Sequence, residues 1–176
     1  NTIAMAEVNT ETDFVAKTDN FKNFAEAVTR KVLEGAKNIG ETMREELMTI
    51  VSQTGENVKI RRFALYKLSG TGKVASYIHM GGKVGVLVEV GCGKAETVAS
   101  DAFGELVHDI TLQIAAAAPR YLTSDEVPEA AIENEKEIAR NSDRFKGKPS
   151  NIVENALVGI VKKFFSEVCL VNQPFV

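Results

Sequence analysis

The sequence predicts an α+β fold, and three observations support this class. Runs of apolar, strand-like residues lead into segments whose apolar residues recur at helical spacing. One such strand-to-helix unit occurs twice, with an offset of 82 residues. A polar segment toward the C-terminus carries two helical stripes that can pack together as an antiparallel hairpin. At 176 residues, the chain can form one large core or two small subdomains.

The first unit opens with a strand-like run from Ile3 to Val8 and continues with a helix from Asn20 to about Gly35. The expected apolar face of this helix is Phe21, Phe24, Ala25, Val28 and Val32. A second helix, about Glu41 to Thr54, is followed by Gly55 at the position of a left-handed cap. Its expected face is Met43, Leu47, Ile50 and Val51.

An extended strand is predicted from Val58 to Leu68, and the switch of alternation near Arg61-Arg62 predicts a β-bulge. A turn at 69–72 follows, where we place a subdomain boundary. The strands Val74 to Ile78 and Val84 to Val90 are separated by residues with hairpin chemistry, His79 to Lys83.

A long helical pattern follows Gly93, ends near Ala118 and is closed by Pro119. This is the second copy of the strand-to-helix unit. The matching positions of the two copies are Glu7-Val8, Phe21, Phe24 and Val28 in the first, and Glu89-Val90, Phe103, Leu106 and Ile110 in the second. The constant spacing favours an internal duplication.

The third part is a helical arm. Ser124 or Asp125 is expected to cap its first helix, whose stripe is Val127, Ala131, Ile138 and Phe145. After a turn at 147–150, Ser150 or Asn151 is expected to cap a second helix with the stripe Val153, Leu157, Ile160 and Phe164. The tail, 168–171 and 174–176, reads as a strand that returns to a sheet, with Pro174 at its edge.

Composition limits the classes of partner. Apolar residues make up 44% of the chain and charged residues 26%, as in soluble globular proteins. A net charge of -3 and a pI near 5.5 argue against nucleic acid as the main partner, because phosphate binding needs a basic surface. The longest uncharged runs are too short for a membrane span of about 20 residues, and no signal-peptide pattern is present. The basic cluster Lys59, Arg61 and Arg62 is either a local contact point or a solvated face, and a solvated face is the commoner case.

No motif points to an enzyme, a cofactor or a metal. Gly72-Lys73 and Gly82-Lys83 lack the upstream glycine of a phosphate-binding loop. His79 and His108 have no catalytic or metal-binding neighbours in the sequence, and Cys92 and Cys169 fit neither a zinc site nor a disulfide framework. A binding function is therefore expected.

The connection after the first strand is the most unusual segment. It places Phe14 next to Asp13 in a short connection that would ordinarily be polar. An aromatic residue there is either buried in the core or presented to a partner. The second copy carries Ala95 and Glu96 at the matching positions, so the fold itself does not require an aromatic residue. Presentation of Phe14 to a partner is the better interpretation.

The segment from Glu7 to Lys17 resembles the signature of the translation elongation factor Ts family, in which a Thr-Asp-Phe-Val motif follows a strand. Further blocks resemble that family in its order: Gly55-Glu56-Asn57, Ile60-Arg61-Arg62, Ser76 to His79, Lys83 to Val88, Ile114-Ala115-Ala116 with Pro119, and Gln173 to Val176. The resemblance covers essentially the whole chain. One departure is Thr10, where many members carry Cys.

The resemblance implies two similar subdomains with small antiparallel sheets flanked by helices, plus an antiparallel coiled-coil helical hairpin. We expect an N-terminal core subdomain at 1–70, a C-terminal core subdomain at 71–122 with 167–176, and the hairpin at 123–166. The implied function is guanine nucleotide exchange on elongation factor Tu, in its GDP-bound and nucleotide-free states, during translation elongation. The alternative is a non-catalytic interaction or ribosome-associated protein with the same fold.

Carried over by position, the partner-binding residues are Thr12, Asp13, Phe14 and Val15, with Phe14 as a wedge, and His79, Met80, Gly81 and Gly82 as a weaker anchor. The resemblance implies that the additional N- and C-terminal modules of the family fall outside this chain, which is expected to be a fragment of a longer protein. We expect a cytoplasmic bacterial protein, or a mitochondrial or plastid one if the parent carries a transit peptide. Exposed sheet edges and the arm leave room for self-association.

Overall fold

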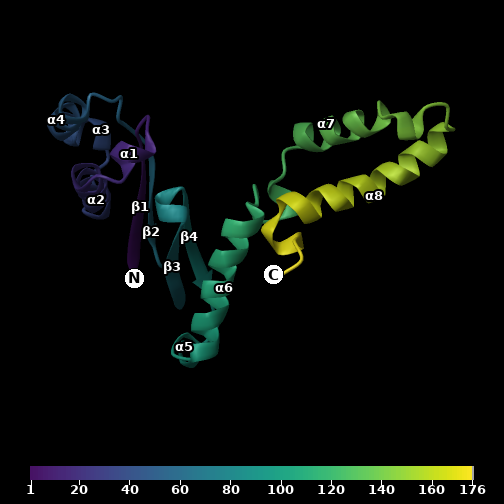
Figure 1. The fold of residues 1–176 in the computed structure, drawn as a ribbon. Coiled ribbons are helices and arrows are strands. Elements are labelled where there is room, and N and C mark those ends of the chain that lie inside the picture. Colours follow the sequence, from purple (N-terminus) through teal and green to yellow (C-terminus); the bar gives the residue numbers. More distant parts are fainter. Residues whose placement is uncertain (176) are drawn as a thin grey trace. The chain divides into compact units, whose positions relative to one another are not determined.

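The computed structural model describes residues 1–175 and confirms the α+β class (Figure 1). It divides into two compact units, Asn1–Thr111 and Leu112–Val176. The strands are β1 (Thr2–Asn9), β2 (Lys59–Lys67), β3 (Gly72–His79) and β4 (Val84–Gly91). The α-helices are α1 (Asp13–Ala16), α2 (Asp19–Leu33), α3 (Ile39–Thr42), α4 (Arg44–Thr54), α5 (Ala95–Val98), α6 (Asp101–Ala117), α7 (Glu129–Arg140) and α8 (Ser150–Val168). Short 3-10 turns are η1 (Met80–Gly82), η2 (Ser124–Glu126), η3 (Asp143–Phe145) and η4 (Leu170–Asn172).

In the first unit, β1 pairs antiparallel with β2, from Thr2 opposite Lys67 to Asn9 opposite Lys59. The register shifts once, because Glu7 pairs with Arg62 whereas Val8 pairs with Ile60. Arg61 is therefore an extra residue in β2. This confirms the predicted bulge, in which two residues of one strand face one residue of its neighbour.

One face of this sheet carries the first core. Ala4, Ala6 and Val8 alternate along β1 and pack against buried residues of the helices, as the two-residue period of a strand requires. The buried residues of this core are Phe21, Phe24, Val28, Val32, Ile39, Met43, Ile50 and Val58. The predicted apolar face of α2 is confirmed at Phe21, Phe24, Val28 and Val32, whereas Ala27 and not Ala25 packs against this core. The second predicted helix is interrupted at Met43, which separates α3 from α4, and α4 ends at Gly55 with a left-handed φ of 69°.

The second sheet is the predicted hairpin of β3 and β4, paired from Gly72 opposite Gly91 to His79 opposite Val84. Its tip has three consecutive residues with positive φ: Met80 at 51°, Gly81 at 64° and Gly82 at 101°. Glycine adopts this conformation readily, whereas it is uncommon for a residue such as methionine. The tip thus combines two permissive residues with one that is strained.

The internal duplication extends to individual elements. Adding 82 to the bounds of α1 gives those of α5, and the start of α2 at Asp19 corresponds to the start of α6 at Asp101. The long helical pattern after β4 therefore contains a break, at the same place as the break between α1 and α2. The predicted second copy is confirmed, with this one-turn helix as an added feature.

The buried face of α6 follows the repeat only in part. Phe103, Val107 and Thr111 are buried, at intervals of four residues, whereas Leu106 is 46% exposed. Leu106 therefore matches the buried Phe24 of the first copy in sequence but not in burial. Spacings of three and four residues both fit a helical stripe, so the pattern alone did not fix which neighbour turns inward.

In the second unit, α7 and α8 run antiparallel as the predicted hairpin (Figure 1). The α8 stripe is confirmed, with Leu157 and Phe164 buried. In the stripe predicted for the first helix of the arm, Val127 and Phe145 are buried. Ile138 is 58% exposed, so its predicted inward position was wrong. The spacing of seven residues that selected Ile138 belongs to a continuous coiled coil, whereas α7 covers only 129–140.

Both helix starts in the arm were also predicted wrongly. Pro128 is the N-cap of α7 and Pro149 that of α8, in place of Ser124 or Asp125 and of Ser150 or Asn151. A proline fixes φ near the helical value, and the residue before it is biased toward extended backbone. Each helix therefore begins immediately after a proline.

The predicted C-terminal strand is absent from the described residues of the tail. Val168 is the last residue of α8, and Cys169 forms a single parallel bridge with Tyr121. The amides of Leu170 and Val171 make two further hydrogen bonds to 121–122, but these residues already belong to η4. The part of the prediction that falls on Val176 lies outside the described residues.

Candidate functional site

The short helix α1 presents Phe14. The ring is 85% exposed, whereas Phe21 in the next helix is 7% exposed. Val15 and Ala16, on the other side of α1, pack partly buried against the first core. The helix is thus attached through Val15 while Phe14 points away from the core. Of the residues predicted here, Phe14 is on the surface and Val15 supports it.

Thr12 fixes the start of α1. Its backbone is extended, and its hydroxyl oxygen accepts a hydrogen bond from the Val15 amide at 3.3 Å, as an N-cap does. The same hydroxyl donates to Glu56 Oε1 at 2.5 Å. Both hydrogen-bonding functions of Thr12 are therefore used within the chain.

Glu56 holds the whole connection between β1 and α1. Its Oε2 accepts hydrogen bonds from the Thr10 hydroxyl at 2.6 Å and from the amides of Glu11 and Thr12 at 3.0 Å each. These bonds keep the pKa of the Glu56 carboxyl below its ordinary range, chiefly through the Thr10 hydroxyl and then the Thr12 hydroxyl. Glu56 follows Gly55, so the end of α4 delivers this carboxylate to the loop.

An ion pair connects this loop to the hairpin tip. Lys83 Nζ lies 3.2 Å from Asp13 Oδ2, and both side chains are more than half exposed. Lys83 directly follows Gly82, the last of the predicted anchor residues. The two predicted segments, Asp13-Phe14 and His79–Gly82, therefore lie close together in the first unit.

The hairpin tip carries an aromatic pair beside an exposed methionine. The Tyr77 hydroxyl lies 2.9 Å from His79 Nδ1, and the two rings stack with centroids 5.7 Å apart. Tyr77 also meets the ring of His108 on α6 edge-on at 6.2 Å. His79 itself is exposed, and Met80 is 64% exposed. Tyr77 thus supports His79 in a fixed orientation.

Sequence reasoning did not single out Glu56 and Lys83 as parts of this site. Glu56 belongs to a family-like block, and Lys83 belongs to another such block and to the predicted hairpin turn, but neither was predicted to contact the Phe14 loop. Their partners lie 44–46 and 70 positions away in the sequence. A local sequence pattern cannot predict hydrogen bonds between residues this far apart in the chain.

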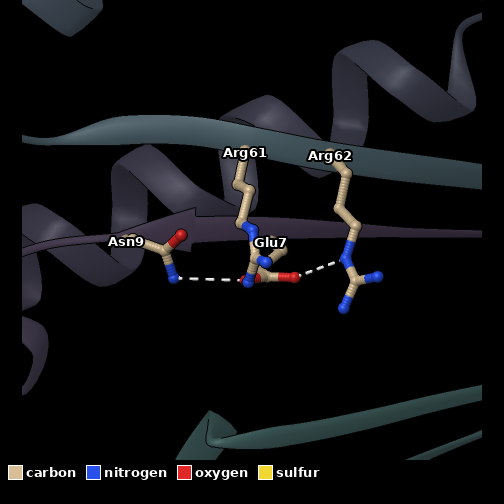
Figure 2. A network of polar contacts seen from close by, with 4 residues as sticks. All are labelled: Glu7, Asn9, Arg61 and Arg62. Carbon is tan, nitrogen blue, oxygen red and sulfur yellow. Dashed lines mark hydrogen bonds and ion pairs between the residues drawn. The ribbon is translucent and has the colours of Figure 1, made fainter.

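A second polar cluster surrounds Glu7 on β1 (Figure 2). Glu7 Oε1 lies 2.7 Å from Arg61 Nη1, and Oε2 lies 2.5 Å from Arg62 Nε. Asn9 Nδ2 donates to Oε1 at 3.4 Å. The bulge at Arg61 allows two consecutive arginines to reach one carboxylate. These bonds lower the pKa of the Glu7 carboxyl, and the bond from Arg61 has the largest effect. The negative charge of Glu7 offsets positive charge at Arg61 and Arg62.

No three His, Cys, Asp or Glu side chains within residues 1–175 are grouped so as to hold a metal ion. Cys92 and Cys169 are free thiols, and burial raises the pKa of Cys169. None of the helices within residues 1–175 is long and apolar enough to span a bilayer.

Comparison with known proteins identifies the family. A sequence model described as Elongation factor TS matches residues 11–176, which include the Phe14 loop and the hairpin tip. The chain belongs to the elongation factor Ts family.

Named relatives agree with this assignment. The Elongation factor Ts of Trichlorobacter lovleyi is 41% identical over 189 residues, which cover 100% of this chain and 60% of the relative. That of Desulfovibrio desulfuricans is 42% identical over 180 residues, with 99% and 63% covered, and that of Nitratiruptor sp. is 40% identical over 182 residues, with 98% and 59% covered. The chain therefore spans about 60% of the length of the curated elongation factor Ts relatives it matches.

Proposed function

We propose that this chain is a guanine nucleotide exchange factor for elongation factor Tu, and that it promotes GDP release by inserting Phe14 into the nucleotide domain of that partner. The observation that carries the proposal is the exposure of Phe14, at 85%, on a loop tied down by Thr12 and Glu56. An exposed aromatic ring contributes nothing to its own fold. It gains apolar burial only when another surface covers it.

The loop is suited to insertion because it is already ordered. The free energy of association is reduced by whatever order must be created at the interface. Here the N-cap bond of Thr12 and the packing of Val15 fix α1 before any partner arrives. A ring on a fixed one-turn helix can enter a packed groove with little further loss of entropy.

The nucleotide is displaced by linkage and not by bond cleavage. A packed groove has discrete arrangements, so a ring that occupies it favours one in which the magnesium and phosphate contacts are poorer. Because coupling is reciprocal, a factor that weakens GDP binding is itself bound more weakly when GDP is present. The chain would therefore bind both the GDP-bound and the nucleotide-free partner, with higher affinity for the latter, and would not act as an enzyme in the usual sense.

The hairpin tip would supply a second contact, on another domain of the partner. Two exposed side chains, His79 and Met80, lie there beside two glycines that let a partner approach closely. A strained residue such as Met80 is typical of binding sites. The Asp13–Lys83 ion pair would keep this anchor in register with the wedge.

The experiment compares GDP release from purified elongation factor Tu in the presence of the unaltered chain and of Phe14→Ala and Asp13→Ala variants. We expect slower release with both variants, and the larger loss with Phe14→Ala. Binding of the unaltered chain to the partner without any acceleration of release would instead identify a non-catalytic interaction protein. Equal rates with all three proteins would contradict the insertion of Phe14.

A further inference from the structure

We infer that Glu56 is a positioning residue for exchange, which holds the loop Thr10–Thr12 in place and thereby presents Phe14. This inference rests on the proposed function, because it assigns Glu56 a role that acts through the inserted ring. The geometry that supports it is one carboxylate accepting four hydrogen bonds from three consecutive residues, at 2.5–3.0 Å.

Glu56 accepts about as many bonds as a carboxylate can, three at Oε2 and one at Oε1. Its two oxygens offer about four lone-pair sites, and hydrogen bonds to a charged group are about twice as strong as neutral ones. Two of the donors are backbone amides, of Glu11 and Thr12, that would otherwise have to be solvated. Loss of the carboxylate would therefore free the loop over three residues at once.

The second copy of the unit serves as an internal control. The positions equivalent to Thr10, Glu11 and Thr12 are Cys92, Gly93 and Lys94. Lys94 is the N-cap of α5 and makes no side-chain capping bond, yet α5 has the same length as α1. The one-turn helix thus forms without a carboxylate that binds the preceding loop. Such a carboxylate, Glu56, is present in the copy that exposes an aromatic ring.

The route from Glu56 to the ring is short. The Thr12 hydroxyl donates to Glu56 and accepts from Val15, the residue after Phe14. Without Glu56 this hydroxyl loses its acceptor, and α1 keeps its core contacts through Val15 and Ala16 but is preceded by a loop that is no longer fixed. Phe14 would then sample several orientations, and insertion would have to select one of them.

The test measures loop order and exchange on the same proteins. Hydrogen exchange of the Glu11 and Thr12 amides is followed in the unaltered chain and in Glu56→Ala, Glu56→Gln and Glu45→Ala variants. Glu45 is an exposed glutamate of α4 and provides the matched loss of a carboxylate. We expect at least tenfold faster exchange at Glu11 and Thr12 in Glu56→Ala, a smaller change in Glu56→Gln, which keeps one acceptor oxygen, and no change in Glu45→Ala.

GDP release from elongation factor Tu then separates a positioning role from others. Glu56→Ala should slow release several-fold, Glu56→Gln less, and Glu56→Ala combined with Phe14→Ala should be no slower than Phe14→Ala alone. Additive losses in the combined variant, or unchanged amide exchange in Glu56→Ala, would overturn the inference. Glu56→Gln keeps the test valid if Glu56→Ala fails to fold.

Failure of the proposed function gives a different result. In that case elongation factor Tu releases GDP at the full rate with Phe14→Ala. Any slowing with Glu56→Ala must then have a cause other than the Phe14 ring, and the positioning role of Glu56 is overturned as well. If Phe14→Ala slows release and Glu56→Ala does not, only the inference about Glu56 is wrong.

Discussion

Thr18 and Ser100 cap two helices in the same way, 82 positions apart. Each hydroxyl accepts the backbone amide three residues later, Phe21 or Phe103, at 3.3 Å. Both phenylalanines are buried to the same extent. The duplicated unit therefore repeats its local hydrogen bonding as well as its pattern of apolar residues.

The two caps should contribute equally to stability. Replacing a capping Ser or Thr by Ala removes an acceptor for a helix-terminal amide and typically costs about 1 kcal/mol. We expect Thr18→Ala and Ser100→Ala each to lower the free energy of unfolding by about that amount, measured by urea titration. Lys94→Ala is the control, since Lys94 makes no side-chain capping bond. Equal stability of all three variants would show that the caps are not stabilising.

Stability should distinguish the exposed from the buried phenylalanine. Phe21→Ala opens a cavity in the first core and should cost about 3–5 kcal/mol. Phe14→Ala removes a ring that is 85% exposed and should change the free energy of unfolding by less than about 0.5 kcal/mol. Urea unfolding of both variants checks this. A loss of several kcal/mol for Phe14→Ala would mean that its ring is part of the core.

Gly72 should tolerate no side chain. A Cβ atom at this position would lie 2.2 Å from the Val90 carbonyl oxygen of the neighbouring strand, which cannot move without disturbing the β3–β4 pairing. We expect Gly72→Ala to cost about 1–3 kcal/mol, as overpacking does, whereas Gly93→Ala has open space and should cost less. Thermal unfolding measures both. A similar melting temperature for the two variants would contradict the close approach.

Acid should remove the contribution of Glu7. Its pKa is lowered in the folded protein by Arg61 and then Arg62, so the pair stabilises the fold above the unfolded pKa, about 4.3 for a free glutamate. This stability is lost as the pH falls through the lower, folded pKa. At pH 7 Glu7→Gln should be less stable than the unaltered chain, and the difference should shrink below about pH 4. Urea titrations between pH 7 and pH 3 measure this difference in the free energy of unfolding. A difference that stays constant with pH would exclude a role for the Glu7 charge.

Local patterns predicted much of the fold. The bulge at Arg61 and the cap at Gly55 depend on neighbours in the sequence, and the repeat matched β4 and α6 to β1 and α2. The exposure of Phe14 followed from the comparison with Glu96. These features could be predicted because each is determined within about one turn of helix or one pair of strands.

Features that depend on distant partners could not be predicted in this way. Glu56 is an ordinary glutamate until the end of α4 brings it to Thr10 and Thr12. The tail resembled a strand, but its amides bond to 121–122 for only two residues, which the tail sequence does not reveal. Leu106 and Val107 fit the helical pattern equally well, and only the arrangement of the surrounding elements decides between them.

The rate of GDP release from elongation factor Tu at saturating concentrations of this chain tests the central claim most directly. Saturation removes differences in affinity, so the rate reports what the bound chain does to the nucleotide site. With saturating Phe14→Ala, GDP should leave elongation factor Tu at least tenfold more slowly than with the unaltered chain. Glu96→Ala, the matching position in the second copy, should retain the full rate. A saturating rate for Phe14→Ala equal to that of the unaltered chain would contradict the claim that Phe14 drives exchange.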